Sequence, residues 1–125
     1  MAGAGSNRFE KRHRLLNEAD YGRVFRKATR SRDSLFTALC RHNDNNTPRL
    51  GLAIAKKHCR RATARNRIKR IVRESFRQHQ ALLAGLDIIV MNQPAAKAAS
   101  NQELSASLET HWQRLSKAKR APQER

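Results

Sequence analysis

The sequence ARNRIKRIVRESFR, residues 64–77, carries the clearest periodic pattern in this chain of 125 residues. On a helix of 3.6 residues per turn, its apolar and basic residues separate onto opposite sides. The apolar side is made up of Ala64, Ile68, Ile71, Val72, Ser75 and Phe76. The basic side is made up of Asn66, Lys69, Arg70, Arg73 and Arg77, with Arg65 and Arg67 on its flanks. The pattern predicts a helix over residues 60–80 that is attached to the domain by its apolar side and turns its cations outward.

The basic side of this helix is unusual for a surface that faces only water. Residues 56–77 hold ten Lys or Arg residues and a single acid, Glu74. Like charges stand four residues apart at Arg65, Lys69 and Arg73, where each pair repels by roughly 0.2–0.5 kcal/mol. Four more cations stand before the helix: Lys56, Lys57, Arg60 and Arg61. The helix dipole disfavours cations at that end, so the segment indicates a site for a polyanion.

The composition of the whole chain points to the same kind of partner. Lys and Arg number 27 against 10 Asp and Glu, which gives a net charge of +17 and a pI near 11.6. An excess of this size favours a polyanionic partner, with nucleic acid as the first candidate and an anionic membrane surface as the second. The longest apolar runs, residues 50–55 and 88–91, are far too short to span a membrane. We therefore expect a cytoplasmic nucleic-acid-binding protein with no membrane partner.

The flanking sequence predicts a small sheet with helices packed on it. A first helix is expected from Asn17 to near Arg30. Strands are expected over residues 34–41, 50–57 and 87–91. A last helix follows the capping box Ser100–Glu103 and carries one apolar stripe of Leu104, Leu108, Trp112 and Leu115. This order, with one further short strand that the pattern does not place, predicts an α+β sandwich with a three- to four-stranded sheet.

The expected strand over residues 50–57 has two different faces. One carries the bulky residues Leu50, Leu52 and Ile54, and we expect it to meet the core. The other carries Gly51, Ala53 and Ala55, and it would let another chain approach the sheet closely.

The chain is short enough for one domain. We expect residues 8–116 to form it, with residues 1–7 as a flexible lead-in and residues 117–125 as a basic, frayed tail. Two cysteines, Cys40 and Cys59, do not make a disulfide framework. Cys59 follows His58, but no CxxC or HxxxH pair completes a zinc site. We therefore expect reduced thiols and no tightly bound metal.

The sequence offers no catalytic cluster of its own. Cleavage of a phosphodiester by protein groups commonly uses clustered carboxylates on metal ions or a pair of histidines. The acids here are isolated or stand at helix starts, and no Gly-rich phosphate loop is present. We therefore expect that no residue of the chain is catalytic.

The segment of residues 56–77 resembles the signature of the protein subunit of bacterial ribonuclease P. The resemblance rests on Arg65-Asn66-Arg67 followed by Lys69-Arg70, and it extends from about Phe9 to Arg114. Its supporting pieces are residues 13–16, 51–53 and 87–90. It implies a small α/β sandwich with a left-handed βαβ crossover, against the general right-handed rule.

The resemblance also implies a function and its partners. Members of the family bind a large catalytic RNA and assist the RNA-catalysed endonucleolytic removal of the 5′ leader from precursor tRNA. The partners implied are therefore the catalytic RNA and precursor tRNA, with no protein partner required. Mg²⁺ would be held mainly by the RNA, with no cofactor bound tightly by the protein.

The resemblance assigns residues to two surfaces. The expected catalytic-RNA surface comprises Lys56, Lys57, Arg60, Arg61, Arg65, Asn66, Arg67, Lys69, Arg70, Arg73 and Arg77. The expected leader surface, in a central cleft, comprises Tyr21, Phe25 and Phe36, and Leu39 stands where some members carry another aromatic. Stacking on aromatic rings is a common way to hold single strands. For Tyr21 and Phe25 the alternative is an ordinary place in the core, because their spacing also fits a buried stripe.

Two other classes compete with this interpretation. A ribosomal or ribosome-assembly protein would share the composition, and only the Arg-Asn-Arg helix separates the two classes. A DNA-binding module would need a helix-turn-helix pair or a dimer seam, and the sequence shows neither.

Overall fold

A computed structural model describes residue 14, residues 18–43 and residues 46–120. Its helices are α1 (Glu18–Arg26), α2 (Ala62–Gln78), α3 (Gln80–Leu83) and α4 (Asn101–Arg120), with the 3-10 helices η3 (Lys56–His58) and η4 (Pro94–Ala98). Its strands are β1 (Thr29–Arg32), β2 (Phe36–His42), β3 (Arg49–Ala53) and β4 (Leu86–Asn92). The predicted α+β class is confirmed.

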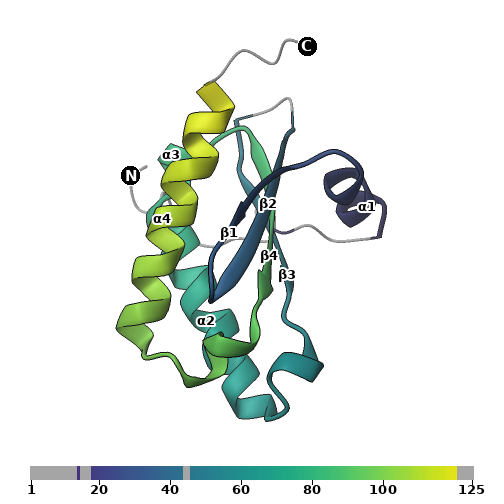
Figure 1. Cartoon of the computed structure of the whole chain (residues 1–125). Helices are drawn as coiled ribbons and strands as arrows, with labels where there is room; N and C mark the ends of the chain where they lie inside the picture. Colours follow the sequence, from purple (N-terminus) through teal and green to yellow (C-terminus); the bar gives the residue numbers. More distant parts are fainter. Residues whose placement is uncertain (1–13, 15–17, 44–45, 121–125) are drawn as a thin grey trace, which may run out of the picture.

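The four strands form one mixed sheet in the order β1-β2-β4-β3. The pairs β1/β2 and β2/β4 are antiparallel, whereas β3 lies parallel to β4. Parallel strands need a crossover connection, and α2 lies within the one that joins β3 to β4. Figure 1 shows α2 and α4 on one face of the sheet and α1 on the other.

The main core lies between the sheet and the pair α2 and α4. The sheet contributes Phe36, Ala38, Cys40, Leu50, Ile88 and Val90, and the helices contribute Ile68, Val72, Phe76, Leu104, Leu108, Trp112 and Leu115. The rings of Phe76 and Trp112 meet edge to face with centroids 6.2 Å apart. Trp112 Nε1 donates to the buried Ser75 Oγ at 2.8 Å, which explains a serine on the apolar side of α2. The predicted apolar faces of both helices are confirmed.

A smaller cluster lies on the other face of the sheet, under α1. It contains Val24, Leu39 and Ile89, with Tyr21, Ala53 and Met91 packed against it. A Cβ atom on Gly51 would lie 2.7 Å from Cζ of Tyr21. The Tyr21 hydroxyl accepts a hydrogen bond from the Leu52 amide at 3.1 Å. The small residues of β3 do let another segment approach the sheet closely, and the segment that lies there is α1 of the same chain.

Several predicted boundaries were wrong. The first helix ends at Arg26, and the strand that the pattern did not place is β1 (Thr29–Arg32). The strand predicted to reach residue 57 ends at Ala53, so Lys56 and Lys57 lie on η3. The last helix continues to Arg120, which places residues 117–120 in α4 rather than in a frayed tail. The predicted cap at Asn17, residues 1–7 and residues 121–125 lie outside the described residues.

A buried polar cluster ties β1 to α4. Ser31 Oγ lies 2.6 Å from His111 Nδ1, and Ser107 Oγ donates to Asp33 Oδ2 at 2.6 Å. His111 Nε2 is 3.2 Å from Asp33 Oδ1, but the geometry is not that of a hydrogen bond. Burial lowers the pKa of His111 and outweighs the Asp33 carboxylate. Burial raises the pKa of Asp33, but hydrogen bonds from Ser107 and two backbone amides outweigh it, so the net shift is downward.

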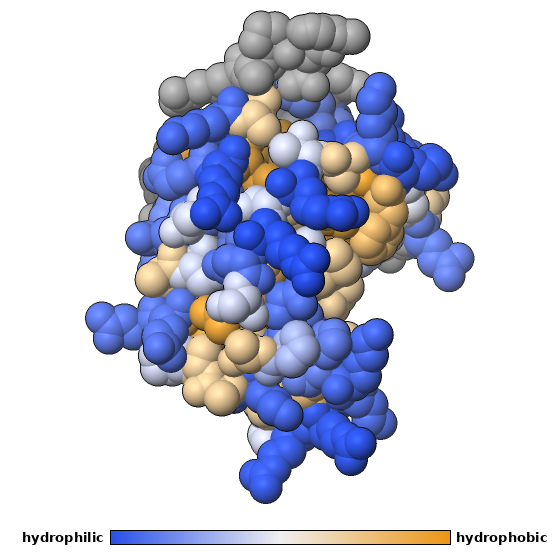
Figure 2. All heavy atoms as spheres, viewed as in Figure 1, coloured by the Kyte–Doolittle hydropathy of each residue, from blue (hydrophilic) through white to orange (hydrophobic). Residues whose placement is uncertain are grey.

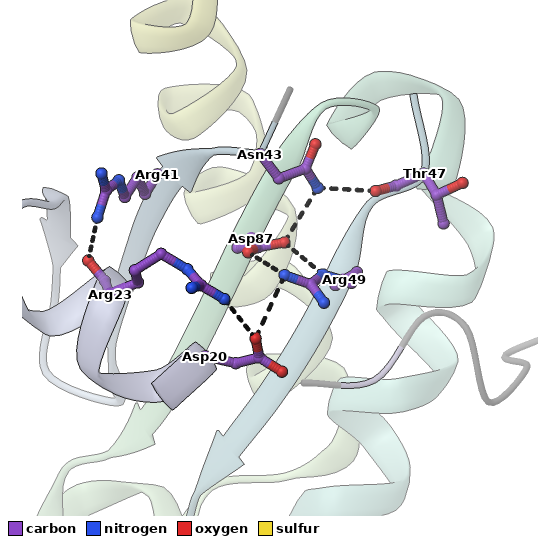
Figure 3. A network of polar contacts seen from close by, with 7 residues as sticks. All are labelled: Asp20, Arg23, Arg41, Asn43, Thr47, Arg49 and Asp87. Carbon is purple, nitrogen blue, oxygen red and sulfur yellow. Dashed lines mark hydrogen bonds and ion pairs between the residues drawn. The ribbon is translucent and has the colours of Figure 1, made fainter. Parts of the chain in front are cut away.

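An ionic network fixes α1 to the sheet (Figure 3). Arg49 donates to both carboxylate oxygens of the buried Asp87, at 2.8 and 2.7 Å. Its guanidinium also lies 3.8 Å from Asp20 of α1, and Asp20 pairs with Arg23 at 2.6 Å. Arg41 donates to the backbone carbonyl of Arg23 at 2.8 Å. The hydrogen bond with Asp87 raises the pKa of Arg49. Two of the chain's few acids are thus used to hold α1 in place.

Candidate nucleic-acid interface

The cationic side of α2 faces outward. Asn66, Arg70 and Arg73 are exposed and Lys69 is half-buried, whereas Ile68 and Val72, on the opposite side, are 0% exposed. The helix is 17 residues long and packs on the core along its length. The predicted orientation of this helix is confirmed.

The outward cations have little compensation from acids. Glu74, the one acid of α2, pairs with Arg77. Within the part of the chain that the structure describes, no carboxylate lies within 4 Å of the side-chain nitrogens of Lys69, Arg70 or Arg73. The like charges on this face therefore keep the repulsion that the sequence indicated, and a bound polyanion would relieve it.

Arg65 and Arg67 bond to the protein's own backbone. Arg65 Nη1 donates to the carbonyl oxygens of Cys59 at 3.0 Å and Arg60 at 2.7 Å. Arg67 donates to the backbone carbonyl oxygens of Lys97 and Ala99, which precede α4, and to the side-chain oxygen of Asn101 at its start. Both side chains stay partly exposed. These contacts were missed because a sequence pattern does not show which carbonyls a folded arginine meets.

Exposed cations also surround the start of α2. Lys56 and Lys57 on η3, with Arg60 and Arg61 just before the helix, are all exposed. Lys97 of η4 lies beside them, because it lines the same pocket as Lys57, Arg60 and Arg61. Figure 2 shows hydrophilic residues gathered at this lower end of the molecule. Lys97 was missed because α3 and β4 separate it from α2 in the sequence, and only the tertiary fold brings it beside the start of α2.

The three aromatic residues assigned to a leader surface lie in different places. Phe25 is 49% exposed and is the one large hydrophobic side chain that stands exposed among the described residues. Figure 2 shows hydrophobic atoms at the surface over α1. Tyr21 is half-buried against Gly51. Phe36 is 0% exposed and packs in the core under α2 and α4. The prediction for Phe36 was wrong, because strand alternation turns this residue toward the helices.

Phe25 shares its side of the sheet with two arginines of β1. The strand register aligns Arg32, Thr37, Met91 and Ala53 in one row, and Arg30 and Leu39 pair in the next row. Arg30 and Arg32 are exposed. Both were missed because the sequence TRSR lacks the apolar alternation that predicts a strand.

The contacts of Ser31, His111 and Asp33 superficially resemble a catalytic triad. His111 is 0% exposed and Ser31 is 5% exposed, so a substrate has no access to them in this conformation. We therefore interpret the cluster as structural. Among the described residues, no three His, Cys, Asp or Glu side chains come together as a metal site. No helix in the described part of the chain is long and apolar enough to cross a membrane.

Comparison with known proteins agrees with this geometry. The ribonuclease P family profile matches residues 9–116. The ribonuclease P protein component of Thioalkalivibrio sulfidiphilus is 49% identical over 108 residues, which cover 86% of this chain and 90% of that protein. The corresponding protein of Pseudoalteromonas atlantica is 46% identical over 113 residues, which cover 90% and 94%.

Solved structures show the same fold. The RNase P protein of Staphylococcus aureus superposes with a TM-score of 0.76 at 31% identity, covering 84% of this chain and 95% of that one. The RNase P protein of Thermotoga maritima superposes with a TM-score of 0.73 at 27% identity, covering 81% and 96%. Sequence and structure agree over nearly the full length of these relatives, and the chain therefore belongs to the bacterial ribonuclease P protein family.

Proposed function

We propose that this chain binds the catalytic RNA of ribonuclease P through the outward face of α2 and the cations at its start. The observation that carries the proposal is a rigid helix whose exposed Arg70 and Arg73 have no carboxylate within 4 Å among the described residues. Guanidinium groups suit paired contacts to phosphate oxygens. If about six phosphates are neutralised, the affinity falls with a log–log salt slope of about −4 to −5.

In this proposal the protein is the accessory subunit of an endoribonuclease, and the RNA carries out the chemistry. The chain neutralises phosphate charge and positions the substrate, which is precursor tRNA. The RNA and its Mg²⁺ ions supply the hydrolysis of the phosphodiester bond that releases the 5′ leader. Each step that we assign to the protein is a binding or positioning step made by its own side chains.

We assign the leader to the sheet face beside α1. Phe25 offers a half-exposed ring for stacking on a base, and Arg30 and Arg32 offer cations for the leader's phosphates. Tyr21 fixes α1 to the sheet beside this surface, because its hydroxyl is hydrogen-bonded to the Leu52 backbone. Phe36 has no part in it.

The test is reconstitution. The purified chain, mixed with the ribonuclease P RNA of its own organism, should raise cleavage of precursor tRNA at low Mg²⁺ and moderate salt. A substrate with a leader of a few nucleotides should gain more than one with a single-nucleotide leader. Affinity purification from cells should recover one RNA of several hundred nucleotides. Recovery of ribosomal RNA, with no gain in cleavage, would overturn the proposal.

A further inference from the structure

Arg49 joins three elements of the fold at one point (Figure 3). It is the first residue of β3, and it donates to both carboxylate oxygens of Asp87 on β4. Its guanidinium also lies 3.8 Å from Asp20 in the first turn of α1. The side chains of Arg49, Asp20 and Asp87 are 26%, 11% and 6% exposed. The sheet therefore holds in a fixed place an arginine that faces the start of α1.

Few apolar contacts hold α1 on the sheet. The helix has nine residues, and isolated helices of this length are marginal in water. Val24 is its one buried apolar residue, and the half-buried Tyr21 packs beside it. Because apolar contacts are non-directional, this small cluster does not by itself fix where α1 lies along the strands.

Polar contacts give α1 a definite position. Besides the ion pair with Arg49, the Tyr21 hydroxyl accepts a hydrogen bond from the Leu52 amide of β3 at 3.1 Å. Arg41 of β2 donates to the carbonyl of Arg23 at 2.8 Å. A partly buried ion pair adds little net stability, because the cost of desolvation offsets most of the attraction. Its effect here is on geometry, since the contact is made only when α1 lies in one place.

The position of α1 decides where Phe25 lies. Phe25 follows Tyr21 by four residues and so shares its side of the helix, with a ring that is 49% exposed. The proposed leader surface combines this ring with Arg30 and Arg32, which belong to the sheet through β1. A shift or rotation of α1 would therefore change the distance between the ring and these two arginines.

We propose that Asp20 and Arg49 are positioning residues for recognition of the leader. Their contact sets α1 against the sheet so that the ring of Phe25 and the arginines of β1 meet the same strand of RNA. Neither Asp20 nor Arg49 contacts the RNA in this scheme. The inference rests on the proposed function and deepens it, because it names residues outside the leader surface that determine the preference for a leader.

The first test uses Asp20→Asn, with Glu18→Gln as the matched control. Both changes remove one acid from the first turn of α1, so they alter the net charge and the interaction with the helix dipole alike. Glu18 is exposed and is not part of the ion pairs around Arg49. The added positive charge would by itself favour RNA, so weaker leader binding in Asp20→Asn alone would have the opposite sign to a general charge effect.

The readout is cleavage by the reconstituted holoenzyme. Loss of one base stack weakens binding by about fivefold or more, so displacement of the ring in Asp20→Asn should raise KM for a long-leader precursor about two- to fivefold. The kcat, the KM for a single-nucleotide leader and the affinity for the catalytic RNA should match those of Glu18→Gln. A long-leader KM in Asp20→Asn equal to that of the control would overturn the inference.

Arg49→Lys is a second variant, which leaves the net charge unchanged. A lysine ammonium cannot bond both oxygens of Asp87 through a planar fork and also face Asp20. We expect the same rise in the long-leader KM as in Asp20→Asn. A full leader preference in Arg49→Lys would refute the role assigned to Arg49.

A double variant asks whether Asp20 acts through Phe25. In a Phe25→Ala protein the ring is absent, so Asp20→Asn should reduce the leader preference no further. Losses that add would refute the positioning of the ring, because Asp20 would then act on the leader independently of Phe25.

The last test follows α1 without RNA. Because the Leu52 amide donates to the Tyr21 hydroxyl, its hydrogen exchange, measured by NMR, reports whether α1 stays on the sheet. Exchange should be about three- to tenfold faster in Asp20→Asn than in the wild type, and unchanged in Glu18→Gln. Unchanged exchange in Asp20→Asn would overturn the claim that this network places α1. If exchange changes as expected but the wild-type holoenzyme gains nothing from a leader, the proposed function fails at the leader while the role of the network in placing α1 stands.

Discussion

Replacing Gly51 with alanine tests how closely α1 is fitted to the sheet. The new Cβ would lie 2.7–2.9 Å from three atoms of the Tyr21 ring and hydroxyl, closer than Cβ contacts allow. The ring must move, and its hydrogen bond with the Leu52 amide is lost. Overpacking costs about 1–3 kcal/mol and the lost hydrogen bond about 1 kcal/mol. The lower entropy of the unfolded chain offsets about 0.4–1 kcal/mol.

The expected net loss in the free energy of unfolding is about 2 kcal/mol, which lowers the melting temperature by roughly 10 °C. Urea titration followed by circular dichroism measures it. Gly22→Ala is the matched control: Gly22 lies in α1, and its nearest neighbour to a new Cβ is Arg26 Nη1 at an ordinary 3.7 Å. That change should stabilise the protein by roughly 0.5–1 kcal/mol.

A double-mutant cycle with Tyr21→Ala completes the test. Once the ring is removed, Gly51→Ala should cost much less, because the three atoms nearest to the added methyl group all belong to Tyr21. A loss near 2 kcal/mol that persists without the ring would refute the reasoning, as would a Gly51→Ala protein as stable as the wild type.

Three further predictions follow from particular side chains. Phe25→Ala should leave the free energy of unfolding nearly unchanged and reduce the preference for substrates with a leader. Phe36→Ala should instead cost about 3–5 kcal/mol of stability with no leader-specific effect. Melting curves, together with cleavage of long- and short-leader substrates, distinguish the two roles. Because burial lowers the folded-state pKa of His111, its neutral form contributes stability that is present above about pH 6.5 and is lost on acidification. The pKa of Asp33 is lowered as well, so its carboxylate contributes stability that is lost below about pH 3.8. Urea titration from pH 7 to pH 3 measures both losses. A His111→Gln protein whose stability still falls between pH 6.5 and 5 as in the wild type would contradict the assignment to His111. Asp87→Asn should cost roughly 2–4 kcal/mol, since it leaves the half-buried Arg49 without its main partner, and a loss below 0.5 kcal/mol in urea titration would count against the network.

The sequence predicted the features that depend on periodicity. The apolar sides of α2 and α4 were recognisable because large apolar residues recur at helical spacing, as at Ile68, Val72 and Leu108. The fold class followed from the order of the elements. Strand β1 was missed because its one inward side chain is the polar Ser31, which is buried through its contact with His111.

The candidate site was predicted in part, for a different physical reason. Helix geometry determines which cations of α2 face outward, so the exposed positions of Arg70 and Arg73 were predicted correctly. The backbone contacts of Arg65 and Arg67, and the position of Lys97, depend on how distant segments pack. Phe36 was misassigned because the alternation of β2 shows two faces but does not show which of them the helices cover.

The most direct test of the account is the salt dependence of catalytic-RNA binding by an Arg70→Gln/Arg73→Gln double variant. Both side chains are exposed and lack a carboxylate within 4 Å among the described residues, so the melting temperature should stay the same or rise slightly. The affinity should fall at every salt concentration, and the log–log slope should shrink by about 1.4–1.8, with Lys117→Gln as the control. An unchanged slope and affinity would contradict the claim that α2 holds its cations outward for RNA phosphates.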